Sequence, residues 1–175
     1  MIISVAEAKE LVDLKGWTDK KIERKLKAIE QTIRAYTNNN FQNRGIRFEG
    51  SVIAQKVYGH VPDLNVGDTI QISESRFNNG LYVIEAIEGN LMTVDSILID
   101  ESHVLVTKIE YPDDVVDCAC NLLEWEVNNR SKVGIQSETL SRHSVTYFNM
   151  DGDNSIMGYP KSLLGCLKAY RRARC

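Results

Sequence analysis

The sequence predicts an α+β protein: a mainly helical domain of three to four helices that carries an inserted small antiparallel β-barrel-like module. Two observations lead to this prediction. Apolar residues recur with a helical period near both ends of the chain, and β-branched residues separated by turn residues fill its middle. With 175 residues, 43% of them hydrophobic, the chain can bury a core without disulfides or metal. We assign residues 1–45 and 111–175 to the helical domain and residues 46–110 to the β module.

Two helices are predicted before the β module. Ser4 and Glu7 have the spacing of a capping box, in which the serine hydroxyl and the glutamate carboxylate each satisfy a free backbone amide. A first helix therefore begins here and runs to about Leu14. Thr18 is placed to cap a longer helix, which the run Asn38–Asn40 ends. The apolar residues of this longer helix fall on one face: Ile22, Leu26, Ile29, Ile33 and Tyr36.

Five short strands are predicted between Arg47 and Glu110. Turn residues recur there about every eight to twelve positions, which is typical of a small all-β module. Gly89-Asn90 forms a two-residue hairpin turn, because glycine readily adopts the positive φ that such turns require. Five strands in this length favour an SH3-like or OB-like barrel. The predicted strands are Ser51–Tyr58, Thr69–Ser73, Leu81–Ile87, Leu91–Asp95 and Val104–Glu110.

Helix resumes at Pro112, where proline at a first helical position and acidic residues in the first turn favour a start. Gly134 is expected to end this helix. Residues 134–148 then form an extended polar stretch, followed by Tyr159-Pro160 and a basic helix that ends at Arg174. A compact enzyme rarely contains such a long polar arm between two amphipathic helices. An assembly protein does, because the arm reaches a neighbouring subunit.

Composition and motifs argue against catalysis. The net charge of −3 creates no basic field for nucleic acid or anionic lipid, and no apolar run approaches the roughly 18 residues of a membrane span. No histidine lies beside a second histidine or a cysteine pair, so we predict no metal, no cofactor and no enzymatic activity. A hydrolase using His143 is a remote third alternative. Ser141, His143 and Ser144 lie in one extended segment, where adjacent side chains point to opposite sides. The cysteines are predicted to be reduced thiols: Cys118, Cys120, Cys166 and Cys175.

Four segments in the two flanks form a recognisable series. They are the helix ending Ile33-Arg-Ala-Tyr-Thr-Asn-Asn-Asn-Phe41, the helix led by Pro112, the arm with Gly134-Ile-Gln-Ser-Glu138 and Ser144-Val-Thr-Tyr147, and the closing Leu167-Lys-Ala-Tyr-Arg-Arg172. This series resembles the head–tail connector proteins of tailed bacteriophages. These adaptors stack as a ring, usually twelve-fold, beneath the portal vertex. The resemblance covers about two thirds of the chain, and the module at residues 46–110 departs from it.

The resemblance implies a structural virion protein that docks under the portal and forms a ring joining the DNA-filled capsid to the tail. The implied partners are the portal protein, a tail-side neck or tail-terminator protein, and further copies of the chain. Genomic DNA would pass through the lumen without specific binding. The protein would reside in the virion neck, and in the host cytoplasm during assembly, with no membrane partner.

Two groups of residues are predicted to make these contacts. Subunit interface or lumen contacts are assigned to the polar arm: Ile135, Ser137, Glu138, Leu140, Arg142, Val145 and Tyr147. Portal docking is assigned to the C-terminal segment, with an apolar stripe and a basic patch: Leu163, Leu164, Leu167, Tyr170, Arg171 and Arg172.

A nucleic-acid-binding regulator is the alternative function. It would use the β module as an OB-like platform, which requires aromatic and basic side chains interleaved on one face. The aromatic and basic side chains available for this are Tyr58, Phe77, Tyr82, Lys56, Arg76 and Lys108.

Overall fold

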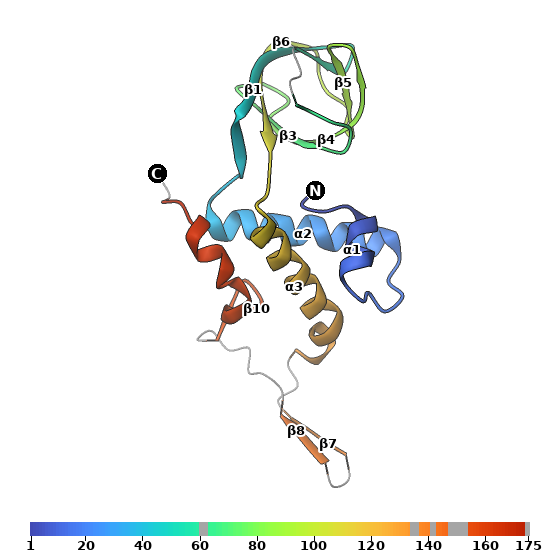
Figure 1. The fold of residues 1–175 in the computed structure, drawn as a ribbon, viewed down its shortest axis with the longest axis vertical. Helices are drawn as coiled ribbons and strands as arrows, with labels where there is room; N and C mark the ends of the chain where they lie inside the picture. Colours follow the sequence, from blue (N-terminus) through green and yellow to red (C-terminus); the bar gives the residue numbers. More distant parts are fainter. Residues whose placement is uncertain (60–62, 134–136, 141–142, 147–153, 174–175) are drawn as a thin grey trace. The chain divides into compact units, whose positions relative to one another are not determined.

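The computed structural model describes residues 1–59, 63–133, 137–140, 143–146 and 154–173 (Figure 1). The chain divides into two compact units. The helical unit comprises Met1–Asn39 and Pro112–Cys175, and the barrel unit comprises Asn40–Tyr111. The prediction of a mixed α and β fold is confirmed. The expectation of a mainly helical protein is wrong, because strands and helices take similar shares of the described residues.

The N-terminal half of the helical unit follows the predicted local signals. Helix α1 (Val5–Leu11) begins with the capping box: the Ser4 amide donates to Glu7 Oε2 at 2.8 Å, and the Glu7 amide donates to Ser4 Oγ at 3.2 Å. It ends three residues earlier than expected. Helix α2 (Asp19–Thr37) ends at Asn38, which adopts a left-handed φ of 49°. Four of the five predicted apolar residues, Ile22, Leu26, Ile29 and Ile33, are inaccessible to solvent, and the fifth, Tyr36, is half-buried.

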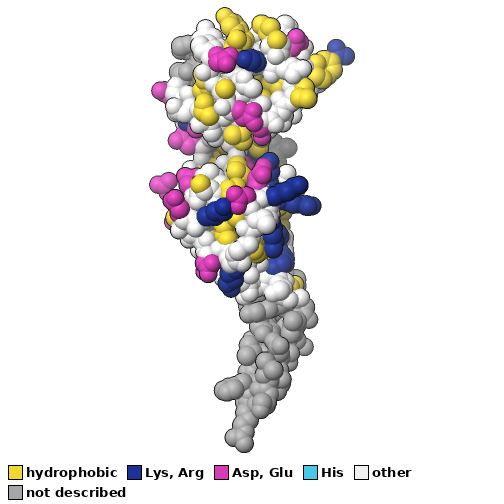
Figure 2. All heavy atoms as spheres, turned by 90° about the vertical axis from the view of Figure 1, so that its right-hand side faces the viewer, with side chains coloured by type: hydrophobic (Ala, Val, Ile, Leu, Met, Phe, Trp, Pro, Cys, Tyr) yellow, Lys and Arg dark blue, Asp and Glu magenta, His cyan; other side chains and the backbone are white. Residues whose placement is uncertain are grey.

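Helix α3 (Asp113–Asn129) packs against α2 and against the C-terminal segment. Its inner face is apolar, with Val115, Ala119, Leu122 and Leu123 fully buried. The short 3₁₀ helix η1 (Arg130–Lys132) follows it. Lys and Arg side chains are exposed over the surface of the helical unit (Figure 2). Within the described residues, no helix is both long and apolar enough to span a membrane.

The C-terminal segment is not the basic α-helix that we expected. It forms two 3₁₀ helices, η2 (Lys161–Leu164) and η3 (Cys166–Tyr170), after the small sheet of β9 (Ser155–Ile156) and β10 (Tyr159–Pro160). Leu164 of η2 and Leu167 of η3 are both fully buried.

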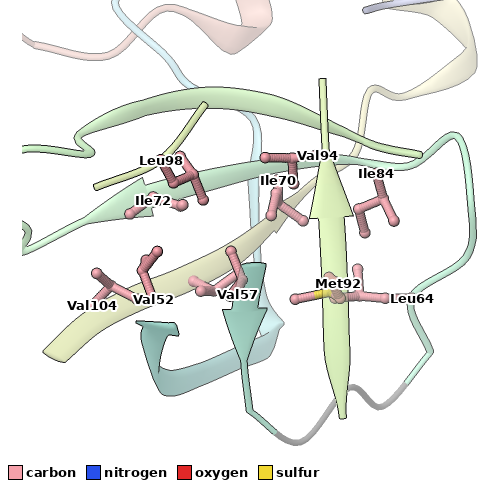
Figure 3. Close-up of a cluster of buried hydrophobic side chains, with 11 residues drawn as sticks. Val52, Val57, Leu64, Ile70, Ile72, Ile84, Met92, Val94, Leu98 and Val104 are labelled. Carbon is pink, nitrogen blue, oxygen red and sulfur yellow. The ribbon is translucent and has the colours of Figure 1, made fainter. Parts of the chain in front are cut away.

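The barrel unit is a closed antiparallel barrel of six strands in the order β1-β2-β5-β4-β3-β6. The antiparallel barrel-like prediction is therefore confirmed. The strands are β1 (Gln42–Ile53), β2 (Lys56–Tyr58), β3 (Thr69–Ser73), β4 (Gly80–Glu88), β5 (Leu91–Val94) and β6 (Glu101–Ile109). Ile70, Ile72, Ile84 and Met92 point into the core from β3, β4 and β5 (Figure 3). The loop residues Leu64 and Leu98 complete this core.

One predicted strand was wrong. Residues 51–58 were expected to form a single strand, but they contain the end of β1, a turn at Ala54-Gln55, and β2. Both turn residues adopt positive φ, 50° and 65°, in a conformation usually reserved for glycine or asparagine. The sequence therefore carries no signal for this turn. Strand β1 also begins at Gln42, so residues 42–45 lie in a strand.

Candidate assembly surfaces

A buried polar cluster lies where the polar arm joins the helical unit. Glu126, at the end of α3, is 3% exposed. Its carboxylate accepts hydrogen bonds from Lys25 Nζ at 2.9 Å, from the Tyr159 hydroxyl at 2.8 Å, and from the guanidinium of Arg130, whose Nε lies at 3.0 Å. The Trp125 ring meets the Tyr159 ring edge-on at 5.4 Å between centroids. We refer to these five residues as the Glu126 cluster.

The hydrogen bonds of the cluster keep Glu126 charged. Burial alone raises the pKa of a carboxyl group, because it penalises the charged form. Hydrogen bonds from Arg130, Lys25 and Tyr159 outweigh that effect and bring the pKa of Glu126 to about 2. Burial and the neighbouring carboxylate in turn raise the pKa of the Tyr159 hydroxyl, so this phenol stays protonated and donates.

The same cluster brings together the segments that precede and follow the arm. Arg130 follows directly after α3, and its Nη1 donates to the carbonyl of Gly158 at 3.4 Å. Tyr159 begins β10, and Lys161 N donates to the Asn154 carbonyl at 3.0 Å. The chain therefore leaves the helical core after residue 130 and returns to the same place near residue 158.

Between these segments, β7 (Ser137–Leu140) and β8 (His143–Thr146) form a two-stranded antiparallel sheet of their own. The register pairs Glu138 with Val145 and Leu140 with His143. The predicted interface residues Ser137, Glu138 and Leu140 lie in β7, and Val145 lies in β8. The predicted residues Ile135, Arg142 and Tyr147 lie outside the described residues.

The predicted portal-docking residues are divided between core and surface. Leu164 and Leu167 are fully buried in the core of their own unit, and Leu163 is half-buried. The expectation that these leucines form an exposed apolar stripe is therefore wrong for Leu164 and Leu167. The sequence did not distinguish the two roles, because an amphipathic C-terminal segment can pack on its own chain or on a partner.

Polar contacts also hold the C-terminal segment to its own unit. The Tyr170 hydroxyl bonds to both carboxylate oxygens of Asp114, at 2.7 and 2.8 Å. The Arg172 amide donates to the Thr37 carbonyl at 2.8 Å, and the Arg171 guanidinium lies 5.4 Å from the centre of the Tyr36 ring. Both arginine side chains are nevertheless exposed, so a basic surface remains available at this end of the helical unit.

In the barrel unit, the loop between β3 and β4 is held by a polar network that the sequence analysis missed. The side chain of Asn78, 2% exposed, donates to the Ile99 carbonyl at 2.8 Å and accepts from the Ile99 amide at 2.9 Å. The Glu101 carboxylate accepts from the Ser75 hydroxyl and from the Arg76 amide, both at 2.5 Å. Those two bonds, the Arg76 amide first, lower the pKa of Glu101.

This network supports an exposed apolar surface, which we call the Ile99 patch: Ile53, Phe77, Ile97 and Ile99, each more than half exposed. Asn78 holds Ile99 close to Phe77. The Gln55 amide donates to Asp100 at 3.1 Å, which brings the turn after Ile53 to the same segment. Figure 2 shows hydrophobic side chains on one face of the barrel unit, with acidic ones among them. Contiguous exposed apolar patches rimmed by polar residues mark interaction surfaces.

The alternation in Ile97-Leu98-Ile99 is the one sequence signal for this patch. Leu98 belongs to the barrel core, while its two neighbours are exposed. Among the described residues, no three His, Cys, Asp or Glu side chains are grouped so that they could hold a metal ion. Comparison of the sequence with protein-family models and with curated proteins found no match.

Proposed function

We propose that this chain is a structural assembly protein, a head–tail connector that docks under a phage portal and forms a ring joining capsid to tail. The observation that carries the proposal is the β7–β8 hairpin. It is a separate sheet within the segment between Arg130 and Gly158, and these two residues are joined at the buried Glu126 cluster. An isolated two-stranded hairpin is at best marginally stable in water. Contact with a neighbouring subunit would supply the packing that such a hairpin requires.

The Ile99 patch gives independent support for an assembly role. Its loop is held by buried hydrogen bonds before any partner arrives, so little conformational entropy remains to be lost on binding. Such a preformed apolar surface suits a permanent junction with a further virion protein, such as the tail-side neck protein. In this proposal, the exposed Arg171 and Arg172 contact the portal through charge, while Leu164 and Leu167 stay in the core.

The nucleic-acid alternative has less support. The barrel unit carries ten acidic and only five basic side chains, which repels a polyanion. Two of the basic side chains are already paired, Lys56 with Glu88 at 2.9 Å and Lys108 with Asp68 at 2.8 Å. The Tyr82 hydroxyl is also engaged, since it donates to the Asn78 carbonyl at 3.0 Å.

Removal of the arm tests the proposal. Residues 134–153 would be replaced by a short Gly/Ser linker, which retains both sides of the Glu126 cluster. We expect the wild-type chain to form rings by negative-stain electron microscopy and by sedimentation, and the linker variant to stay monomeric. Circular dichroism should show an unchanged helical signal in the variant.

Leu11→Ser is the matched control, because Leu11 is 63% exposed in the helical unit and lies outside the arm. This variant should assemble like the wild type. Rings formed equally well by the linker variant would overturn the role of the arm. A wild-type chain that stays monomeric but binds labelled single-stranded DNA in a salt-dependent manner would favour the nucleic-acid alternative.

A further inference from the structure

Two cysteine thiols from distant parts of the sequence contact the same backbone carbonyl of the C-terminal segment. Cys118 lies on α3 and Cys166 begins η3. Both sulfurs contact the same acceptor, the carbonyl oxygen of Leu163, at 3.3 Å from Cys118 Sγ and 3.5 Å from Cys166 Sγ. The two sulfurs are therefore no farther apart than the sum of these distances.

The two thiols differ in access to solvent. Cys118 is 1% exposed, whereas Cys166 is exposed. Burial, together with the neighbouring Cys166, raises the pKa of the Cys118 thiol, which makes Cys118 a poor initial nucleophile at neutral pH. A reagent in solution therefore reaches Cys166 first, and Cys118 lies behind it, in position for a second step.

We propose that Cys118 and Cys166 form a dithiol site that exchanges with low-molecular-weight disulfides and closes to an intramolecular disulfide between α3 and η3. The expected reduced state of the cysteines is the open form of this site. A disulfide needs Cβ atoms about 3.5 to 4.5 Å apart, so closure must bring the Cβ atoms of Cys118 and Cys166 to that separation.

The exchange proceeds in two balanced steps. The Cys166 thiolate attacks one sulfur of the small disulfide, forms a mixed disulfide and releases one small thiolate, which takes up a proton. Cys118 then loses its proton and attacks the Cys166 sulfur, which releases the second small thiol. Two protein thiols are oxidised to one disulfide, and one small disulfide is reduced to two thiols.

Closure would link the C-terminal segment covalently to α3. Before closure, the segment is held by the buried Leu164 and Leu167 and by the Tyr170–Asp114 hydrogen bonds. A covalent link between residues this far apart in sequence restricts the unfolded chain strongly. We therefore expect the oxidised protein to unfold at a temperature higher by at least about 5 °C.

The test uses a parent chain with Cys120→Ser and Cys175→Ser, so that only the proposed pair remains. After treatment with oxidised glutathione, mass spectrometry should show the loss of two hydrogens and a cross-linked peptide containing Cys118 and Cys166. The unfolding temperature should rise and return to its original value with dithiothreitol. The matched variant adds Cys118→Ser and should accumulate glutathione on Cys166 with no such rise.

Three outcomes would overturn the proposal. The parent could accumulate only the glutathione adduct on Cys166, it could react only after urea denaturation, or its disulfide could leave the unfolding temperature unchanged. Because the readout concerns only the monomer, the result is independent of whether the chain assembles into rings.

Discussion

At the scale of single residues, Glu126 of the helical unit combines burial with a negative charge. Its carboxylate is buried and yet charged, which is tolerated because three donors surround it. Those donors come from α2, from η1 directly after α3, and from β10, through Lys25, Arg130 and Tyr159. One side chain on α3 therefore contacts α2 and β10, which are far from it in sequence.

Glu126→Gln should destabilise the protein by about 2 to 3 kcal/mol at neutral pH, because it removes the charge that Lys25 and Arg130 compensate. The folded pKa of about 2 lies below the ordinary glutamate pKa of 4.5. The stabilisation is thus complete above pH 4.5 and is lost as the pH falls towards 2. Urea denaturation across this range should show a steeper loss of stability in the wild type than in the variant.

Glu124→Gln is the matched control, since Glu124 lies on the same helix and is exposed. It should change the free energy of unfolding by less than about 0.5 kcal/mol. Equal losses in the two variants would show that the buried cluster contributes no special stability.

At the scale of elements, the β3–β4 loop shows how a connection becomes a rigid surface. Loops are usually mobile because their backbone groups bond to water. Here the side-chain amide of Asn78 hydrogen-bonds to both the backbone amide and the backbone carbonyl of Ile99, as a neighbouring strand would. The Glu101 carboxylate fixes the neighbouring Ser75 and Arg76 amide. The Ile99 patch therefore has a defined shape without any partner.

Asn78→Ala should destabilise the barrel unit by about 2 to 3 kcal/mol, because it leaves the amide and carbonyl of Ile99 without their partner. Hydrogen exchange at the Ile99 amide should accelerate more than elsewhere in the barrel. Asn65→Ala, at an exposed position of the same barrel, serves as the control and should have little effect. Unchanged protection of the Ile99 amide in the Asn78 variant would contradict the proposed role of this network.

At the scale of the whole molecule, the barrel unit is inserted so that the chain enters and leaves it side by side. The Phe41 and Tyr111 rings lie 4.9 Å apart, and the Glu110 amide donates to the Phe41 carbonyl at 2.9 Å. The barrel is closed and has its own apolar core. The barrel unit therefore has the continuous chain and the separate core that are expected of a domain.

Residues 40–111 should consequently fold when expressed alone. We expect dispersed amide signals in a ¹⁵N–¹H correlation spectrum and one cooperative thermal transition. The control is Ile70→Asp in the same fragment. Ile70 is fully buried in the barrel core, so a charged side chain at this position should leave the fragment unfolded. A disordered spectrum for the unmodified fragment would show that the barrel depends on the helical unit.

The sequence predicted those features that depend on neighbouring residues. The capping box at Ser4 and Glu7, the buried face of α2 and the limits of β3 were all confirmed. A helix cap needs residues only three positions apart, and an apolar face repeats within a few turns. Local patterns of this kind can be read without knowing which parts of the chain meet.

The tertiary structure decided the rest, because those features depend on contacts between residues far apart in sequence. Ala54-Gln55 turns left-handed although neither residue favours that conformation, since β1 and β2 must pair within a closed barrel. Leu164 and Leu167 could equally have faced a partner, and only their packing against α3 assigns them to the core. The Ile99 patch likewise exists because Asn78 and Glu101 meet across the loops, which no local pattern encodes.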